Sequence, residues 1–320
     1  MKVSVIGNGR WGSFLAWYAA RTGHDVTLYG RPGSPRTAQF EETRKNDLLA
    51  LPENVTLTSD FARALAGEVV LVSIPSQNLR QLLAQVAEAR PAGRPLYVLC
   101  MKGLEIATGE RLSQVAKEML GEDSRVAVWL GPGHVQEFVR GAPNCMVVDS
   151  EDEAEKRFLI GAFGSDLIRF YYGEDLIGNE VGAAAKNVVG IAAGMLDGFG
   201  LTSLKGALMS RGTREYARLI KAMGGNELSA YGLCHLGDYE ATVFSPHSNN
   251  RMFGERFIQG KSYEKLAEGY YTVQAMVGLS EKMGVELPIS RALYQVLYQQ
   301  GEPQKVLDGL FSRSLKQEFY

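Results

Sequence analysis

Val3-Ser4-Val5-Ile6-Gly7-Asn8-Gly9-Arg10-Trp11-Gly12 lies near the start of this 320-residue chain and contains the pattern G-x-G-x-x-G. The pattern follows an apolar run typical of a strand and opens an amphipathic helical segment. In this context Gly7 permits a tight turn, Gly9 lets a pyrophosphate approach the backbone, and Gly12 lets the helix pack closely on the strand. The N-terminus of that helix then faces the phosphates of a dinucleotide. The alternative is a glycine turn without a ligand.

Beyond this motif, residues 1–177 alternate short β-branched runs with segments of helical period, which is typical of βαβ units around a parallel sheet. We predict an α/β fold class with an N-terminal Rossmann-type doubly wound sheet that forms a dinucleotide-binding domain. The expected strands are Lys2–Ile6, Asp25–Tyr29, Val69–Ile74, Pro95–Cys100, Val126–Leu130 and Cys145–Asp149, and the expected helices include Gly12–Thr22 and Asn78–Ala89.

From residue 178 onward the β-branched runs disappear and helical spacing continues between glycine-bearing breaks. We predict an all-helical C-terminal domain over residues 178–320 that carries the substrate and catalytic groups. Its expected helices include Glu180–Leu196, Leu204–Met223, Tyr263–Met283 and Ser290–Gln300.

The composition excludes several classes of protein. The 34 Lys and Arg residues nearly balance 36 Asp and Glu residues, so no basic field would attract nucleic acid or an anionic membrane. Three scattered cysteines make no disulfide framework, and the four histidines show no metal-ligand spacing, so we expect no metal. We find no signal peptide, no apolar stretch long enough to insert into a membrane, and no G-x-S-x-G nucleophile. The expected location is the cytoplasm.

The end of the second strand indicates which dinucleotide is bound. NAD-preferring sites place an acidic residue there to bind the ribose 2′-hydroxyl, whereas this chain has Tyr29-Gly30-Arg31. The guanidinium of Arg31 could bind a 2′-phosphate, so the cofactor is NADP or NAD with NADP favoured. The alternative is that Arg31 is a solvated loop residue.

Two lysines and an aspartate are candidate catalytic residues. Lys102 follows a predicted strand, where ligands of open α/β sheets bind, although it could be an ordinary loop residue. Lys186 lies in a helix of small residues, and burial there would lower its pKa toward the range useful for proton exchange, unless the side chain extends into water. Asp238 could hold either lysine or cap a helix. Ser248 and Asn250 in a neighbouring polar loop could bind a substrate oxygen.

Over nearly its whole length the chain resembles the bacterial NAD(P)-dependent glycerol-3-phosphate dehydrogenases. The resemblance implies reversible hydride transfer between NAD(P)H and dihydroxyacetone phosphate, which supplies glycerol 3-phosphate for phospholipid synthesis; a homodimer would fit the family. The matching segments are Gly7–Gly12, Pro75-Ser76, Lys102-Gly103, Gly131-Pro132, Glu180–Asn187, Asp197-Gly198, Ser210-Arg211-Gly212, Leu236-Gly237-Asp238, Arg251 with Phe253-Gly254, and Glu268-Gly269.

The resemblance also implies roles for individual residues. Lys186 would exchange a proton with the C2 oxygen, Lys102 would contact cofactor and substrate, and Asp238 would be the acid of the catalytic site. The implied cofactor-binding positions are Gly7, Gly9, Arg10, Trp11, Gly12, Arg31, Lys102, Val135, Asn249, Leu266 and Glu268. The implied substrate-binding positions are Lys102, Gly131, Gly133, Lys186, Asp238, Ser248, Asn249 and Asn250.

Three departures from the family pattern leave room for a different substrate. Asn249 replaces an arginine expected to pair with the substrate phosphate, a charge that Arg251 or Lys205 could supply instead. Gly133 stands where Ser or Thr is usual, and His235 and Tyr239 stand where smaller or apolar residues are usual. The alternatives are therefore a related dehydrogenase acting on a hydroxy acid or another polyol phosphate, and a non-catalytic NADP-binding sensor.

Overall fold

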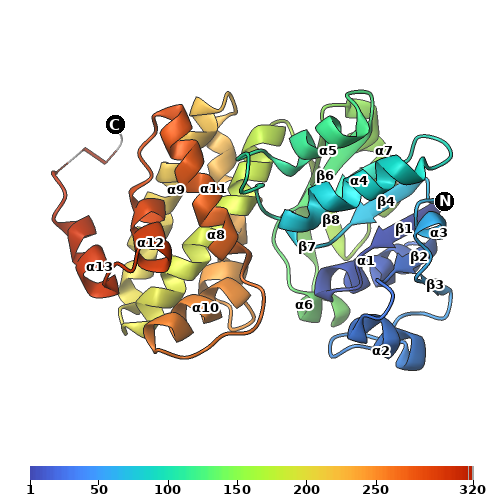
Figure 1. Ribbon diagram of the computed structural model, residues 1–320, viewed down its shortest axis with the longest axis horizontal. Helices are drawn as coiled ribbons and strands as arrows, with labels where there is room; N and C mark the ends of the chain where they lie inside the picture. The colour runs from blue at the N-terminus through green and yellow to red at the C-terminus, as the bar shows by residue number, and fades with distance from the viewer. Residues whose placement is uncertain (316, 319–320) are drawn as a thin grey trace.

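The computed structural model describes residues 1–315, 317 and 318, and it places an α/β part beside a helical part (Figure 1). One sheet in the order β3-β2-β1-β4-β5-β6-β7-β8 forms the α/β part. Its strands are β1 (Lys2–Ile6), β2 (Asp25–Tyr29), β3 (Val55–Thr58), β4 (Val69–Val72), β5 (Leu96–Leu99), β6 (Arg125–Leu130), β7 (Asn144–Ser150) and β8 (Ile168–Tyr172). The first six follow the doubly wound order, so the predicted fold class is confirmed.

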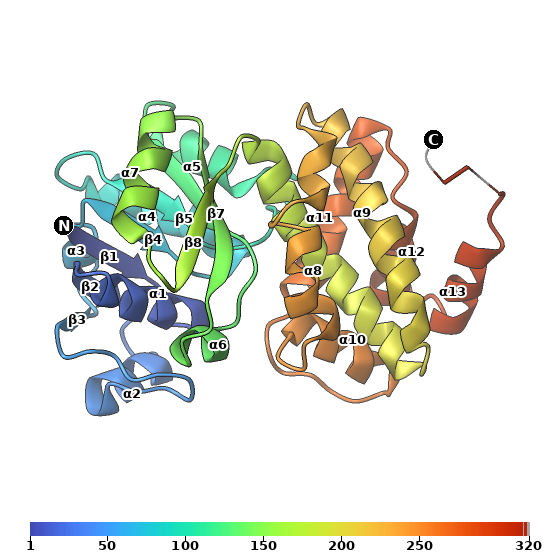
Figure 2. The ribbon, with the colours of Figure 1, turned by 180° about the vertical axis from the view of Figure 1, so that it is seen from behind.

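Helices cover both faces of the sheet. Side chains of α4 and α5 pack on the face seen in Figure 1, and those of α1 and α7 pack on the face seen in Figure 2. The helices of this part are α1 (Arg10–Arg21), α2 (Pro35–Thr43), α3 (Phe61–Ala64), α4 (Leu79–Ala89), α5 (Leu112–Leu120), α6 (Val135–Val139) and α7 (Glu153–Phe163).

The sheet differs from the prediction at its two edges. Strands β3 and β8 were missed because each lies at an edge with part of its side chains exposed, so neither has a continuous apolar run. The sheet is parallel, as predicted, except at one pair of neighbouring strands, where β7 runs antiparallel to β6. The five-residue helix α6 is only about 8 Å long, whereas six-residue β6 spans about 20 Å, so α6 cannot return the chain to the starting end of the sheet.

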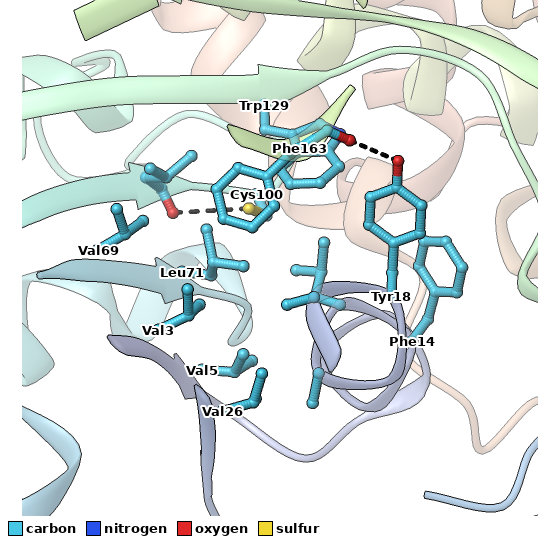
Figure 3. Close-up of a cluster of buried hydrophobic side chains, with 14 of the residues drawn as sticks. Val3, Val5, Phe14, Tyr18, Val26, Val69, Leu71, Cys100, Trp129 and Phe163 are labelled. Atoms are coloured by element: carbon cyan, nitrogen blue, oxygen red, sulfur yellow. Dashed lines mark hydrogen bonds between the residues drawn. The ribbon is translucent and has the colours of Figure 1, made fainter. Parts of the chain in front are cut away.

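Aromatic packing holds α1 against the sheet (Figure 3). Phe14 and Tyr18 of α1 are fully buried, and the Tyr18 ring meets Trp129 of β6 edge-on at 5.9 Å. The Tyr18 hydroxyl also donates a 2.5 Å hydrogen bond to the carbonyl oxygen of Phe163 in α7. These contacts therefore fix α1, the helix that follows the glycine motif, against the sheet.

One long helix, α8 (Leu176–Gly198), forms the axis of the helical part and packs against α9, α10, α11 and α12. The crossing of α8 and α10 is close: a Cβ at Gly194 would lie 1.9 Å from the Arg251 carbonyl oxygen. The other helices are α9 (Lys205–Ala222), α10 (Asn249–Ile258), α11 (Glu268–Met283), α12 (Pro288–Tyr298) and α13 (Pro303–Phe311). Among the described residues no helix is both long and apolar enough to span a membrane.

The helical prediction holds in outline and fails in detail. The helices expected in α8, α9 and α12 are confirmed, whereas α11 begins five residues later than expected, at Glu268. The segment around Ser248 was treated as a loop, but Ser248 caps α10 through its hydroxyl, which accepts a hydrogen bond from Arg251 N. Residues 173–175 link β8 to α8, so the predicted domain boundary after residue 177 falls in the first turn of α8 and stays a prediction.

A buried ion pair connects the two parts near that link. Arg111, just before α5, places Nη1 2.6 Å from Oε2 of Glu180 in α8. The Glu180 carboxylate also accepts hydrogen bonds from the backbone N–H and hydroxyl of Ser113 at 2.9 and 2.5 Å. Both charged side chains are at most 10% exposed, so the pairing satisfies groups that water cannot reach.

Replacing this carboxylate should destabilise the protein strongly. Glu180→Gln leaves the buried Arg111 guanidinium without a counter-charge, and we expect a loss of about 3 kcal/mol in the free energy of unfolding, measured in urea. Asp166→Asn is the matched control: Asp166 pairs with Arg21 at 3.8 Å on an exposed surface, and its loss should cost at most about 1 kcal/mol. Equal effects of the two substitutions would contradict the assignment.

Candidate active site

The glycine motif forms an open cradle between β1 and α1. Gly7 has φ +106°, and a Cβ at Gly12 would lie 1.8 Å from the Gly7 carbonyl oxygen, so neither position accepts a side chain without strain. A Cβ at Gly9 would meet nothing nearer than Nη1 of Arg36, at 4.0 Å. The start of α1 therefore offers backbone N–H groups and a guanidinium to an anion, which fits the pyrophosphate of a dinucleotide.

Other predicted cofactor positions surround this cradle. Arg10 Nη2 donates to Gln136 Oε1 at 3.4 Å, and the Trp11 ring lies 6.3 Å from that of Phe138, so the start of α1 is next to α6. Val135, the first residue of α6, is buried there. The Arg31 side chain is exposed in the loop after β2.

Two further cofactor positions come from the helical part. Glu268, the first residue of α11, accepts a 2.8 Å hydrogen bond from the hydroxyl of Ser76, which follows β4. Burial raises the pKa of Glu268 above its ordinary value, and the hydrogen bonds from Ser76 act in the opposite direction. Leu266 precedes α11 and is 43% exposed. The structure thus brings Glu268 to the carboxyl ends of the strands and leaves Leu266 at the surface of the same segment.

Asp238 holds both candidate lysines with one oxygen atom. Its Oδ2 lies 2.7 Å from Nζ of Lys102, which follows β5, and 2.9 Å from Nζ of Lys186, in the middle of α8. Lys102 also donates to the Gly131 carbonyl oxygen at 2.6 Å, and Lys186 donates to Thr242 Oγ1 at 2.7 Å. The predicted cluster is therefore assembled from three segments far apart in the chain.

The cluster keeps polar atoms that could act on a ligand. Each ammonium has three N–H donors. Within the described part of the chain, Lys102 donates to Asp238 and Gly131, and Lys186 donates to Thr242 and pairs with Asp238, so at least one donor remains on each lysine. Asp238 Oδ1 is buried and has no hydrogen-bond partner among the described residues. A hydroxyl or carbonyl group placed here would meet two donors and one acceptor.

Burial sets the protonation of Lys186. Desolvation lowers the pKa of Lys186 to about 8, against the effect of the Asp238 carboxylate, which raises it, and together with the Lys102 charge, which lowers it. Near neutral pH this lysine is an ammonium that can give up its proton at little cost. The group therefore suits proton exchange with a reacting oxygen.

The residues flanking Asp238 secure its turn. His235 Nδ1 hydrogen-bonds the Gly182 carbonyl oxygen of α8 at 2.8 Å, and His235 Nε2 meets the Tyr239 hydroxyl at 2.7 Å. Burial lowers the pKa of His235 to about 4, so the ring is neutral. His235 and Tyr239, the third departure from the family pattern, therefore hold the turn (Leu236–Asp238) against α8.

The glycines after β6 form the opposite wall. Gly131 is buried beside Lys102, and Gly133 has φ +148°, where a Cβ would lie 2.3 Å from the Phe138 ring. The Phe138 ring thus occupies the space that a serine or threonine at position 133 would need. This packing accounts for the second departure.

Ser248, Asn249 and Asn250 are partly engaged within the protein. Ser248 caps α10, and Asn249 Oδ1 accepts a 3.0 Å hydrogen bond from the Tyr263 hydroxyl. Asn250 Nδ2 donates to Asn187 Oδ1, and Asn250 Oδ1 accepts from Gly269 N. Asn250 is buried and joins α8, α10 and α11, whereas the amide nitrogen of Asn249 makes no hydrogen bond within the described part of the chain.

The two cations considered as substitutes for the missing arginine are paired inside the protein. Asp197 Oδ2 lies 2.6 Å from Lys205 Nζ and 2.8 Å from Arg251 Nε, and Arg251 also pairs with Glu255 at 3.1 Å. Among the described residues no group of three metal-binding side chains comes together.

Sequence reasoning missed residues whose role depends on tertiary contact. Thr242 accepts from Lys186 and donates to the Asp238 carbonyl oxygen at 2.8 Å, yet it lies in an unremarkable apolar run. Arg36 reaches the glycine cradle from α2, and Ser76 reaches Glu268. The Pro75-Ser76 pair at a strand end was a signal for the last of these, and the other two had none.

Comparison with protein families covers nearly the whole chain. The family model described as NAD-dependent glycerol-3-phosphate dehydrogenase N-terminus matches residues 2–156, and the one described as the C-terminus of the same enzyme matches residues 175–308.

Individual relatives agree with this match. The glycerol-3-phosphate dehydrogenase (NAD(P)+) of Pelodictyon phaeoclathratiforme is 34% identical over 332 residues, covering 99% of each chain. The enzyme of the same name from Corynebacterium glutamicum is 36% identical over 332 residues, covering 99% of this chain and 100% of its own. The crystal structure of glycerol-3-phosphate dehydrogenase from Coxiella burnetii aligns with a TM-score of 0.91 at 26% identity, covering 98% of this chain and 99% of that one.

Proposed function

The chain belongs to the NAD-dependent glycerol-3-phosphate dehydrogenase family, and from this premise we propose the reaction and the role of each site residue. The protein is an NAD(P)-dependent oxidoreductase that interconverts dihydroxyacetone phosphate and sn-glycerol 3-phosphate. The observation that carries the residue roles is the position of Asp238 Oδ2 between the Lys102 and Lys186 ammonium groups.

The residues of the glycine cradle hold the dinucleotide. The backbone at Gly9 and the start of α1 receive the pyrophosphate, with Arg10, Trp11 and Val135 beside it. When bound, the dihydronicotinamide supplies a hydride to the C2 carbon of the ketone. Glu268 and Lys102 flank this end of the site, at the carboxyl ends of β4 and β5.

Lys186 transfers the proton. In the reducing direction its Nζ donates a proton to the C2 oxygen as the ketone becomes a secondary alcohol, and in the oxidising direction the neutral amine takes that proton back. The free N–H of Lys102 stabilises the negative charge that develops on the same oxygen. Both donors are already oriented by Asp238, so little reorganisation accompanies the reaction.

Asp238 also contacts the substrate. Its free Oδ1 accepts a hydrogen bond from a substrate hydroxyl, while Gly131, Gly133, Ser248, Asn249 and Asn250 form the surrounding wall. In this arrangement residues 1–177 bind the dinucleotide, and residues 178–320 supply the helical substrate domain with Lys186 and Asp238.

We also propose a cellular location for the enzyme and a use for its product. Three free cysteines, two of them buried, fit a reducing cytoplasm, and the product would enter phospholipid synthesis.

A recess of about 630 Å³ between α8, α9, α12 and α13 is lined mainly by apolar side chains, and Phe311 at its edge is 68% exposed. We propose that a second copy of the chain covers this recess, which would make the protein a homodimer.

The activity is tested by following NADPH and NADH oxidation with dihydroxyacetone phosphate beside unphosphorylated dihydroxyacetone. We expect turnover that depends on the phosphate group. Equal turnover of both ketones, or turnover only with a keto acid, would favour the related dehydrogenase that Asn249 suggests. A folded, cofactor-binding protein that turns over none of these would be a sensor.

The protonation of Lys186 should govern the pH profile. Reduction needs the ammonium, so kcat/KM for the ketone should fall as the pH rises above about 8; oxidation needs the amine, so its kcat/KM should rise toward the same pH. Lys186→Ala should lower kcat by about 10²-fold or more and leave the Kd for NADPH unchanged.

Lys221→Ala is the matched control, because that side chain is 68% exposed on α9. Its kcat and pH profile should equal those of the unsubstituted enzyme. Retention of the alkaline limb of the profile in Lys186→Ala would assign the titrating group to another residue.

Arg31 should determine the choice of dinucleotide. Loss of its guanidinium in Arg31→Ala should raise the Kd for NADPH about tenfold or more, because a charge-assisted contact to the 2′-phosphate is removed, and should change the Kd for NADH about twofold at most. Fluorescence titration measures both constants. Arg63→Ala, at another exposed position of the α/β part, is the control, and equal losses for the two dinucleotides would refute the contact.

A further inference from the structure

Two histidines from different parts of the fold meet beside the lysine cluster. His134 follows β6 and precedes α6, and His247 lies between the π-helical turn Glu240–Phe244 and α10. Their ring centroids are 5.7 Å apart with an interplanar angle of 76°. The charges of Lys186 and Asp238 act on the His134 ring, so the pair lies next to the lysine cluster.

The free atoms of this pair point to a ligand. His134 Nε2 is buried and has no hydrogen-bond partner among the described residues, which leaves an unsatisfied polar atom at the site. His247 is exposed, and its backbone N–H is held by the Ser245 hydroxyl at 3.1 Å. The two rings are in edge-to-face contact, so an acceptor would lie beside the pair, within reach of the unpartnered His134 Nε2 and of the exposed His247 ring.

The charge balance of the site favours an anionic acceptor. One of the two lysine charges is neutralised by Asp238, and the other lies next to the C2 oxygen in the proposed reaction. Lys205 and Arg251 are paired with Asp197, and Asn249 is neutral. The imidazoles of His134 and His247 then offer N–H donors, and become cations when protonated, to a second anionic group on the ligand.

We propose that His134 and His247 bind the phosphate group of the substrate, one ring from each part of the fold. This inference rests on the proposed function. It assigns to the two histidines the phosphate contact that the family pattern gives to an arginine at position 249. A phosphate dianion draws protons onto both rings, so the rings need not be charged before the substrate arrives.

The surroundings of the pair make the contact sensitive to pH. Burial lowers the pKa of His134, the Lys186 and His247 charges lower it further, and the Glu137 and Asp238 carboxylates raise it. A proton on the His134 ring is therefore easily lost above neutral pH. An arginine, which stays charged, would show no such loss.

Substitution of either histidine should weaken phosphate recognition selectively. We expect His134→Ala and His247→Ala each to raise the KM for dihydroxyacetone phosphate about tenfold, with kcat changed about threefold at most and the KM for dihydroxyacetone unchanged. His24→Ala is the matched control, because His24 hydrogen-bonds the Ala162 carbonyl oxygen on the α7 side of the sheet. Gln variants at both positions repeat the test with less loss of volume.

A rescue distinguishes charge from packing. Asn249→Arg added to His247→Ala should restore the KM for dihydroxyacetone phosphate. The double variant should also show less increase in KM between pH 7 and 9 than the unsubstituted enzyme, since the effect of Lys186 is common to both. Equal increases in KM for the phosphorylated and unphosphorylated ketones would overturn the proposal and place the rings against the carbon chain or cofactor.

A binding measurement separates this inference from the reaction itself. Inorganic phosphate, without cofactor, should raise the pKa values of His134 and His247 measured by NMR and leave that of His24 unchanged. Absence of that shift in an enzyme that reduces dihydroxyacetone phosphate would refute the histidine contact alone. Failure of the unsubstituted enzyme to reduce this ketone would refute the proposed reaction, and a phosphate-induced shift would then still identify an anion site.

Discussion

The rest of the site depends on one carboxylate oxygen shared by two ammonium groups. Asp238 is 1% exposed, and a charge so deeply buried is stable only when it is paired. The pairing joins the end of β5, the middle of α8 and a short turn of the helical part. The relative position of the sheet and the helices is thus tied to the geometry of the proposed catalytic groups.

The family pattern and the local departures are compatible once the neighbours are considered. Gly133 faces the Phe138 ring, which fills the space of a side chain, and His235 with Tyr239 holds the turn that carries Asp238 against α8. These changes lie around the lysine cluster and leave its atoms in place. Asn249, by contrast, puts a neutral side chain where the family pattern has a charged arginine.

The sequence predicted what local chemistry determines. The glycine motif requires its turn wherever it stands, and the small residues around Lys186 indicate a helix that must be buried. Strands β3 and β8 were not predicted because edge strands lack a continuous run of buried apolar residues. Helix α10 was not predicted because Ser-Pro and Asn-Asn pairs are as typical of loops as of the start of a helix. Thr242 and Arg36 act through contacts across the fold, which no single segment reveals.

Glu180, which pairs with Arg111, lies on α8 six residues before Lys186. At 1.5 Å per residue, the pivot and Lys186 are about 9 Å apart along the axis of α8. A tilt of the helical part by about 5° around this pivot would move the lysine by only about 0.8 Å, whereas the far end of α8 would move more than twice as far. Because this lever arm is short, a small change in the angle between the two parts would displace Lys186 little.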